Sequence, residues 1–307
     1  MTNAPILLVG NGPNRVSPQG VSWSQLMGEL RATAGMATSG HETKPFPLHF
    51  EEIRNAFLAR TPKAKEATFL RLVAKRMEAL RPNDIHRRLT ALNVANILTT
   101  NYDDCLERAL APTASVADFD TGESKHSLFR RSRIGRRYFW HLHGEIWRPN
   151  SVLLGHDRYV ESCSHLRHYL DPRQGIAFKQ HPQGLKALFL DANAAISVRR
   201  PHSWVDLFML RDVHIVGLSM DYTEIDLWYL LSLRHRLRLH PAAARDRLRK
   251  TRVVFHTFDQ DTPALRQHRQ LLESFGATCR VHPLRAQDYA GAWDGLLATL
   301  ERELGRA

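Results

Sequence analysis

The sequence predicts an α/β protein whose core is a doubly wound parallel sheet, and two observations lead to this prediction. Short apolar runs bounded by turn residues recur along the chain, and segments with a helical period of apolar residues lie between them. Runs this short and this continuously apolar are typical of parallel strands that are covered on both faces. Their alternation with helices is the pattern of a doubly wound sheet.

The elements follow one another in a regular order with two interruptions. Residues 35–92 and residues 156–201 are helix-like and contain no expected strand. Because a crossover between parallel strands needs only about a dozen residues, we interpret these stretches as helical insertions that form a small cap subdomain. No repeat or linker divides residues 1–307, so we expect a single domain. The expected strands are 6–9, 94–98, 138–142, 213–216, 253–255 and a run around 278–281, and the expected helices are 23–33, 65–80, 102–110, 222–239, 263–275 and 289–304.

Composition excludes several classes of protein. No run reaches the roughly 18 consecutive apolar residues of a membrane-spanning helix, and the amino terminus lacks the pattern of a secretory signal. We therefore expect a cytoplasmic protein. The three cysteines, Cys105, Cys163 and Cys279, are far apart and form no C-x-x-C pair, so the sequence predicts neither a disulfide framework nor a zinc ribbon.

The net charge of +12 raises the question of nucleic-acid binding. Neither basic cluster is accompanied by stacking aromatic residues or by a known nucleic-acid-binding motif. Arginine is also spread along the whole chain, which is equally typical of a solvated surface. We keep direct nucleic-acid binding as a possible but not favoured function. The two clusters are Arg130, Arg131, Arg133, Arg136 and Arg137, and Arg245, Arg247, Arg249, Lys250 and Arg252.

Polar and glycine residues follow four of the expected strands. In open α/β sheets, ligands bind beyond the carboxyl ends of the strands, so this pattern predicts a binding crevice there. Gly10 and Gly12 after the first strand are compatible with a pyrophosphate at a helix start. The third glycine of the G-x-G-x-x-G motif is replaced by Arg15, and a purely structural turn explains the two glycines equally well.

Asn101 and His143 each have two interpretations from the residues alone. An asparagine after a strand often caps the following helix, so capping and ligand binding are equally compatible with Asn101. His143 shares a strand face with His141, which permits a metal pair. Because no third ligand stands at a recognisable spacing, we expect no metal at this position.

Taken together, the motifs resemble those of the sirtuin-like domains of bacterial antiphage defence. The resemblance spans roughly residues 5–230. It rests on Gly10-Asn11-Gly12-x-Asn14, Thr99-Thr100-Asn101-Tyr102-Asp103, Leu142-His143-Gly144, Leu154-Gly155-His156-Asp157-Arg158-Tyr159, and Gly217-Leu218-Ser219 with Asp226 downstream, in that order.

The resemblance implies a Rossmann-like fold and a set of site residues for NAD. It places Asn101 and His143 beside the nicotinamide ribose as catalytic residues, and it places Asp103 toward the nicotinamide amide. It gives the pyrophosphate and adenosine contacts to the glycine-rich turn and the G-x-S segment. The implied cofactor-binding residues are Gly10, Asn11, Gly12, Asn14, Thr99, Asp103, Gly217 and Ser219.

Two departures from the protein-deacylating sirtuins bear on the activity. The zinc ribbon of those enzymes is not predicted here, and Thr100 stands where they have glutamine. The relatives that hydrolyse NAD share both features, so the resemblance implies an NAD glycohydrolase that uses NAD as its substrate. The alternatives are an NAD-dependent protein deacylase and a non-catalytic subunit that binds NAD or ADP-ribose.

Cleavage of NAD makes few chemical demands on such a site. Nicotinamide leaves its ribose as a neutral base, so no acid is needed to protonate it. We hypothesise that His143, neutral near its ordinary pKa of about 6.5, accepts a proton from a ribose hydroxyl or the attacking water. Asn101 would orient that water, because an amide donates and accepts at once.

Because free NAD hydrolysis would harm the cell that makes the enzyme, the resemblance also implies restraint by assembly. We expect a homo-oligomer with a regulatory protein partner, such as a motor ATPase or a nucleic-acid sensor, and no membrane partner. The arginine clusters are suited to such a contact as well as to nucleic acid.

Overall fold

A computed structural model describes most of the chain. The described residues are 4–20, 22–37, 43–62, 66–113, 117–119, 127–170, 203–239, 246–260, 262–286 and 288–306. The greater part of the predicted insertion at 156–201 therefore lies outside them. Among the helices that these ranges contain, none combines the length and the apolar character needed to cross a bilayer.

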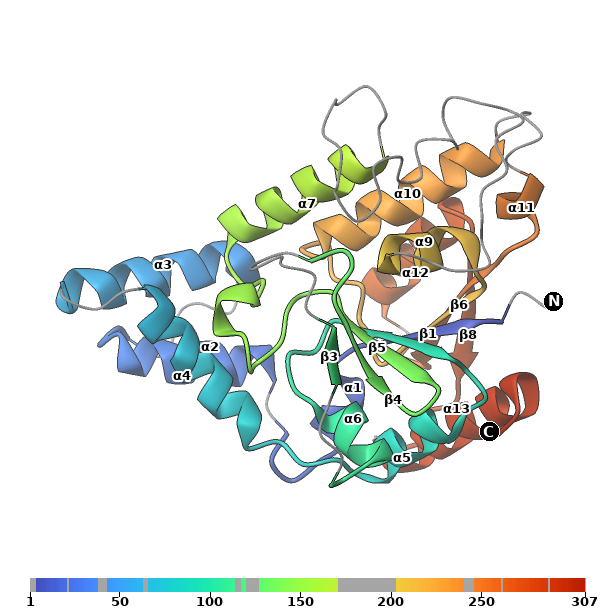
Figure 1. Ribbon diagram of the computed structural model, residues 1–307, viewed down its shortest axis with the longest axis horizontal. Helices are drawn as coiled ribbons and strands as arrows, with labels where there is room; N and C mark the ends of the chain where they lie inside the picture. Colours follow the sequence, from blue (N-terminus) through green and yellow to red (C-terminus); the bar gives the residue numbers. More distant parts are fainter. Residues whose placement is uncertain are drawn as a thin grey trace.

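An eight-stranded sheet forms the centre of the molecule (Figure 1). Its order is β3-β4-β5-β2-β1-β6-β7-β8, and the run from β5 to β8 is parallel. This confirms the predicted doubly wound, Rossmann-like sheet. The strands are β1 (Ile6–Val9), β2 (Asn96–Thr99), β3 (Ala117–Phe119), β4 (Arg131–Ile134), β5 (Arg137–His141), β6 (Val213–Val216), β7 (Val253–Phe258) and β8 (Ala277–His282).

The direction of winding reverses at β1. This strand pairs with β2 on one side, with Val9 opposite Thr99, and with β6 on the other, with Val9 opposite Val216. Reversal of strand order opens a crevice at the carboxyl ends of the two central strands, because the connections on either side run to opposite faces. The residues after β1 and β6 therefore meet at this point.

Both faces of the sheet are buried, which explains the continuously apolar strand sequences. Along β1, Leu7 and Val9 pack in one core, while Ile6 and Leu8 pack in the other. The first core lies under α5 (Asp84–Ala91), α6 (Cys105–Leu110) and α13 (Tyr289–Leu304). The second lies under α7 (His156–Leu170), α9 (Trp204–Leu210), α10 (Ile225–Leu239), α11 (Asp246–Arg249) and α12 (Pro263–Ser274).

A helical cap extends beyond the carboxyl ends of the strands, at the left of Figure 1. It consists of α2 (Trp23–Thr33), α3 (Phe46–Arg60) and α4 (Glu66–Glu78), whose core around Phe50, Ile53 and Phe69 also includes residues that follow β2 and β5. The predicted insertion at 35–92 thus contributes α3 and α4. Its third helix, α5, packs on the sheet instead, since Ile85 and Leu89 belong to the core beneath α13.

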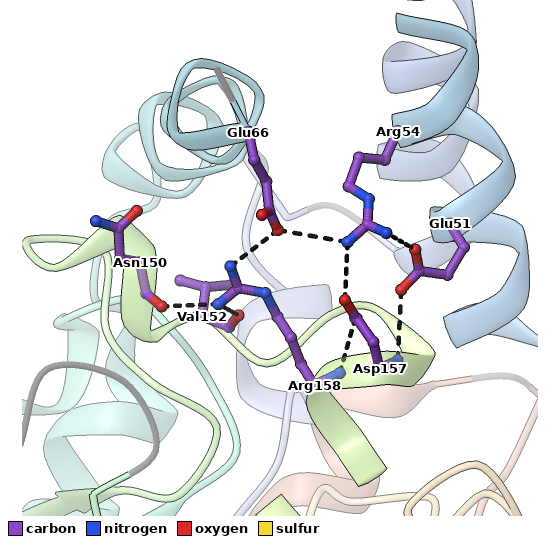
Figure 2. Close-up of polar contacts among 7 residues, drawn as sticks. All are labelled: Glu51, Arg54, Glu66, Asn150, Val152, Asp157 and Arg158. Carbon is purple, nitrogen blue, oxygen red and sulfur yellow. Dashed lines mark hydrogen bonds and ion pairs between the residues drawn. The ribbon is translucent and has the colours of Figure 1, made fainter. Parts of the chain in front are cut away.

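Ion pairs fasten the cap to the start of α7 (Figure 2). Arg54 of α3 contacts Asp157 at 3.1 Å and also pairs with Glu51. Arg158 reaches Glu66 of α4 at 2.9 Å and donates to the carbonyl of Asn150 at 2.7 Å. The Asp157-Arg158 pair of the sequence motif therefore holds α3, α4 and α7 together at the rim of the crevice.

The antiparallel strands β3 and β4 were not predicted. Their stretch reads as a basic cluster, because arginine alternates with other residues along β4 and into β5. The structure shows that much of this cluster is used inside the chain. Arg130 is buried against Glu145 at 2.6 Å, and Arg137 donates to the carbonyls of Leu92 and Val94 at 2.6 and 2.9 Å.

Candidate active site

A cavity of about 690 Å³ lies between the carboxyl ends of the central strands and the cap. Its wall combines the glycine-rich turn after β1, the G-x-S segment after β6, and aromatic residues of the cap. Five residues implied by the family resemblance line it: Asn11, Gly12, His143, Gly217 and Ser219. Other residues of the wall include Arg15, Trp23, Phe46, Thr100, Tyr102, Tyr159 and Glu224.

The glycine contact, made by Gly10, Gly12 and Gly217, joins the two halves of the crevice. The amide of Gly12 donates to the carbonyl of Gly217 at 2.8 Å. A Cβ on Gly10 would lie 2.6 Å from the Gly217 oxygen, and one on Gly12 would lie 2.7 Å from the Gly217 Cα. Close packing of two backbones therefore requires these glycines, which is the structural interpretation of the turn.

A second cavity of about 430 Å³ lies on the other side of this contact. It shares Gly12, Arg15, Gly217, Leu218 and Ser219 with the first cavity. Its remaining wall is largely aromatic, with Phe258 of β7 and Tyr289 and Trp293 of α13. The two cavities thus meet at the carboxyl ends of β1 and β6, with the exposed Arg15 bordering both.

Asn101 lies just behind the wall of the larger cavity. Its side chain is buried, and Nδ2 donates to the carbonyl of Gly10 at 3.1 Å. Its backbone amide donates to the hydroxyl of Thr99, which itself donates to the carbonyl of Val9. Asn101 therefore ties β2 to the glycine-rich turn, while its neighbours Thr100 and Tyr102 face the cavity. In this structure it does not cap α6 with its side chain; α6 begins after Asp104.

Asp103 and Asn14 form a polar network beneath the turn. Asn14, only 1% exposed, donates through Nδ2 to Asp103 at 2.8 Å and to Asn11 at 3.0 Å. The second oxygen of Asp103 accepts from the amide of Cys105. His86 completes the network at 3.1 Å from Asn14 Oδ1, and burial lowers the pKa of His86 to about 4. These residues support the cavity floor and fix the shape of the turn.

His143 occupies the wall of the larger cavity and is 2% exposed. Its Nε2 lies 2.9 Å from Asp226 Oδ2, and its Nδ1 lies 3.7 Å from Glu224 Oε2. Burial acts to lower the pKa of His143, but the two carboxylates outweigh it and raise the pKa above its ordinary value. This differs from the neutral imidazole that the sequence analysis assumed.

Glu224 is the side chain that sequence reasoning missed. It directly precedes α10 and lines the cavity beside His143 and Tyr159. The Tyr159 hydroxyl hydrogen-bonds to the carboxyl group of Glu224. Burial is the main cause that raises the pKa of Glu224 to about 7. No local pattern in the sequence singles out this residue; its position downstream of the G-x-S segment was the one available signal.

Asn101 and His143 follow the ends of two neighbouring parallel strands, β2 and β5. The last pair of the register is Thr99 with His141, and each of the two residues stands two positions farther along its own segment. Adjacent parallel strands are separated by about 4.8 Å, which is within the width of a nucleotide. The sheet therefore brings the two segments to the same edge, where His143 lines the cavity and the Asn101 side chain lies behind its wall, bonded to Gly10.

His141 has a structural position rather than a metal-binding one. Its Nδ1 lies 2.8 Å from the backbone oxygen of Asn101, and its Nε2 lies 2.9 Å from Glu107. Burial acts to lower the pKa of His141, but Glu107 raises it to about 9. Both ring nitrogens carry protons in that state and donate, so neither is available to a metal ion.

Within the described residues, one group has the residue types of a metal site, namely His143, Glu224 and Asp226. The group contains no cysteine, so it is not the zinc ribbon of the deacylases. Its two carboxylates flank opposite nitrogens of the imidazole. One ligand atom of each residue lies within 4.8 Å of those of the other two, so the spacing as well as the residue types would suit a metal ion, which the sequence analysis did not expect.

Comparison with known proteins gives a family match over part of the chain. Residues 95–194 match the family model described as a SIR2-like domain. The match contains Asn101, His143 and Tyr159, whereas the glycine contact and Glu224 lie outside it. A comparison with curated proteins gives no match.

Proposed function

We propose that this chain, which carries a SIR2-like domain over residues 95–194, is an NAD hydrolase that cleaves the bond between nicotinamide and ribose. The proposal assigns NAD the place of substrate, with nicotinamide and ADP-ribose as products. SIR2-like domains act on NAD, and the geometry of the crevice supports the same ligand here.

One observation carries the proposal: two cavities join at the glycine contact, and His143 stands in the wall of the larger one. A dinucleotide has two nucleoside ends joined by a pyrophosphate. The pyrophosphate would pass over Gly12 and Gly217, where no side chain covers the backbone. The Arg15 side chain borders both cavities at this point. The nicotinamide riboside would then occupy the cavity beside His143, and the adenosine would occupy the aromatic cavity.

The walls also fit the reaction. The nicotinamide ring of NAD is cationic, and the carbon it leaves develops positive charge. The carboxylates of Glu224, in the wall, and of Asp226, buried behind His143, give this cavity a negative potential, which stabilises such a charge. Trp23, Phe46 and Tyr102 provide an aromatic surface for a flat cationic ring.

The proposal gives Asn101 a positioning role. Its side-chain bond to Gly10 holds the end of β2 against the turn over which the pyrophosphate passes. Loss of this bond would loosen both the turn and the segment that follows β2. A displacement of this kind, of about 1 Å, is sufficient to lower a rate about 10²-fold.

The test is the release of nicotinamide from NAD by the purified chain, followed by chromatography with identification of the ribosyl product. We expect wild-type turnover and a loss of about 10²-fold or more in His143→Ala and Asn101→Ala. Asn55→Ala, on the exposed face of α3, is the matched control and should behave as wild type. Calorimetry with NAD separates the alternatives: binding without turnover would select the non-catalytic subunit.

We further propose that the activity belongs to an antiphage defence assembly that depletes NAD. This rests on the resemblance of the motifs to defence proteins, in which a homo-oligomer is restrained by a regulatory partner. Light scattering on the purified chain tests the oligomer. A monomer that hydrolyses NAD at full rate would rule out restraint by assembly, and removal of acyl groups from lysine without NAD hydrolysis would select the deacylase.

A further inference from the structure

Glu224 differs from the other acidic residues around the cavity in having an uncommitted carboxylate oxygen. Oε2 is shielded from solvent and has no hydrogen-bond partner in the described part of the chain. It lies 3.7 Å from His143 Nδ1, beyond hydrogen-bond distance. The side chain nevertheless keeps 15% exposure and forms part of the cavity wall. A buried oxygen without a partner is costly, so an unpaired carboxylate oxygen on a residue of the cavity wall indicates a functional role.

The neighbouring groups are less suited to accept a proton. Asp226 is fully buried and committed, since one oxygen lies 2.9 Å from His143 and the other accepts from the amide of Leu227. His143 is held between two carboxylates, and its raised pKa keeps the ring protonated over a wider range of pH. A protonated imidazole can donate but cannot accept. Asp221 is exposed and accepts from the backbone and hydroxyl of Thr223.

We propose that Glu224 is the proton acceptor of this site and that His143, fixed by Asp226, positions and stabilises its carboxylate. The inference rests on the proposed NAD hydrolysis. In the step concerned, the water oxygen forms a bond to the anomeric carbon of the ribose. The bond from that carbon to nicotinamide breaks, and its electron pair passes to the pyridine nitrogen. The water proton moves to the Glu224 carboxylate, which later releases it to solvent.

The surroundings of Glu224 suit this role at neutral pH. Burial raises its pKa to about 7, where a base is both available and strong enough to act. The charged and titratable groups that face it are His143, Asp226, Asp221, Tyr159 and Tyr102. His143 and Tyr159 favour the carboxylate form, whereas the two aspartates favour the protonated form. The Glu224 carboxyl group therefore changes charge within the pH range in which enzymes usually work.

The decisive variant is Glu224→Gln in the full chain, because it preserves the shape of the side chain and removes the proton acceptor. We expect nicotinamide release to fall by about 10² to 10⁴-fold, with the Kd for NAD changed by less than about threefold. The rise of wild-type kcat/KM with pH around 7 should disappear in this variant. Glu303→Gln, an exposed acid on α13, is the matched control and should keep the wild-type profile.

Rescue of activity by azide distinguishes a proton acceptor from a residue with a purely structural role. Azide is already an anion and needs no proton acceptor, so it can attack the anomeric carbon without Glu224. We expect added azide to restore nicotinamide release in Glu224→Ala, with azido-ADP-ribose as the product. The same addition should not restore a variant that has lost the fold or the NAD site.

The outcomes separate this inference from the proposed function. Wild-type turnover with a slow, NAD-binding and azide-rescued Glu224 variant supports both. Wild-type turnover with a fully active Glu224→Gln overturns the role of Glu224 and leaves NAD hydrolysis intact. A Glu224 variant that no longer binds NAD, or that azide does not rescue, also overturns the role. A wild-type chain that neither binds nor cleaves NAD overturns both.

Discussion

Nδ1 of His141 donates to the backbone oxygen of Asn101 at 2.8 Å, so one histidine of the His-x-His pair fixes the segment that carries the predicted catalytic asparagine. The other nitrogen of His141 donates to Glu107 of α6 at 2.9 Å. The two histidines therefore have different roles. His143 faces the cavity, and His141 anchors the loop that approaches it from the neighbouring strand.

Replacement of His141 by leucine tests this anchor. The variant leaves Glu107 buried without its charged partner, so we expect the free energy of unfolding to fall by about 3–5 kcal/mol. Because the folded pKa of His141 is raised to about 9 from about 6.5, its stabilising effect is complete below pH 6.5 and is lost as the pH rises through 9. Urea unfolding measured from pH 6 to 10 should show this loss in the wild type. An equal loss in His141→Leu would contradict it.

Acid should destabilise the protein through a different set of histidines. His214, His256 and His282 lie on β6, β7 and β8, with ring nitrogens 3.1 and 3.0 Å apart. Burial, with the neighbouring histidines, lowers the pKa of His256 to about 3. Their stabilising effect is therefore complete above pH 6.5 and is lost as the pH falls toward 3. Thermal unfolding between pH 8 and 4 measures this.

His256→Phe is the informative variant for the acid effect, because it keeps an aromatic ring that cannot be protonated. We expect its melting temperature to fall less steeply with decreasing pH than that of the wild type. His156→Gln, at an exposed position on α7, should leave the wild-type slope unchanged. Parallel slopes in all three proteins would show that acid acts elsewhere.

Alanine substitutions at two glycines, one inside the glycine contact and one outside it, should have opposite effects on stability. Gly12→Ala would place a methyl group 2.7 Å from the Cα of Gly217, so we expect a loss of about 1–3 kcal/mol in stability and weaker NAD binding. Gly295→Ala, in α13 with no atom within 4 Å of the new methyl, should instead stabilise the protein by about 0.5–1 kcal/mol. Chemical unfolding and NAD titration of both variants check the contrast; equal stabilities would refute the close packing.

The ion pairs between the cap and α7 should help to position the wall of the larger cavity (Figure 2). Arg158→Met removes the contacts to Glu66 and to the carbonyls of Asn150 and Val152. Because the next residue, Tyr159, lines the cavity, we expect KM for NAD to rise as well as the melting temperature to fall. Arg167→Met, at an exposed position of the same helix, is the control. Unchanged KM in Arg158→Met would show that the cap does not set the position of Tyr159.

Much of the fold is readable from the sequence because parallel strands buried on both faces must be apolar throughout. The ranges 6–9 and 213–216 coincide with β1 and β6, and the helices 23–33 and 289–304 coincide with α2 and α13. The hairpin edge was missed because β4 is rich in arginine, whose aliphatic stems and aromatic neighbours supply the packing that a propensity argument assigns to apolar residues.

The sequence by itself determined the parallel strands of the sheet, the glycines of the crevice and the position of His143 after a strand, because local periodicity and chain order are sufficient for these features. Only the tertiary structure decided three contacts of the site. The Asn101 side chain donates to the carbonyl of Gly10, and Asp103 accepts a hydrogen bond from Asn14. The carboxylate of Glu224 lies beside His143. These contacts join residues far apart in the chain. The directions of these side chains depend on how the helices and strands pack together, and a local sequence pattern does not predict that packing.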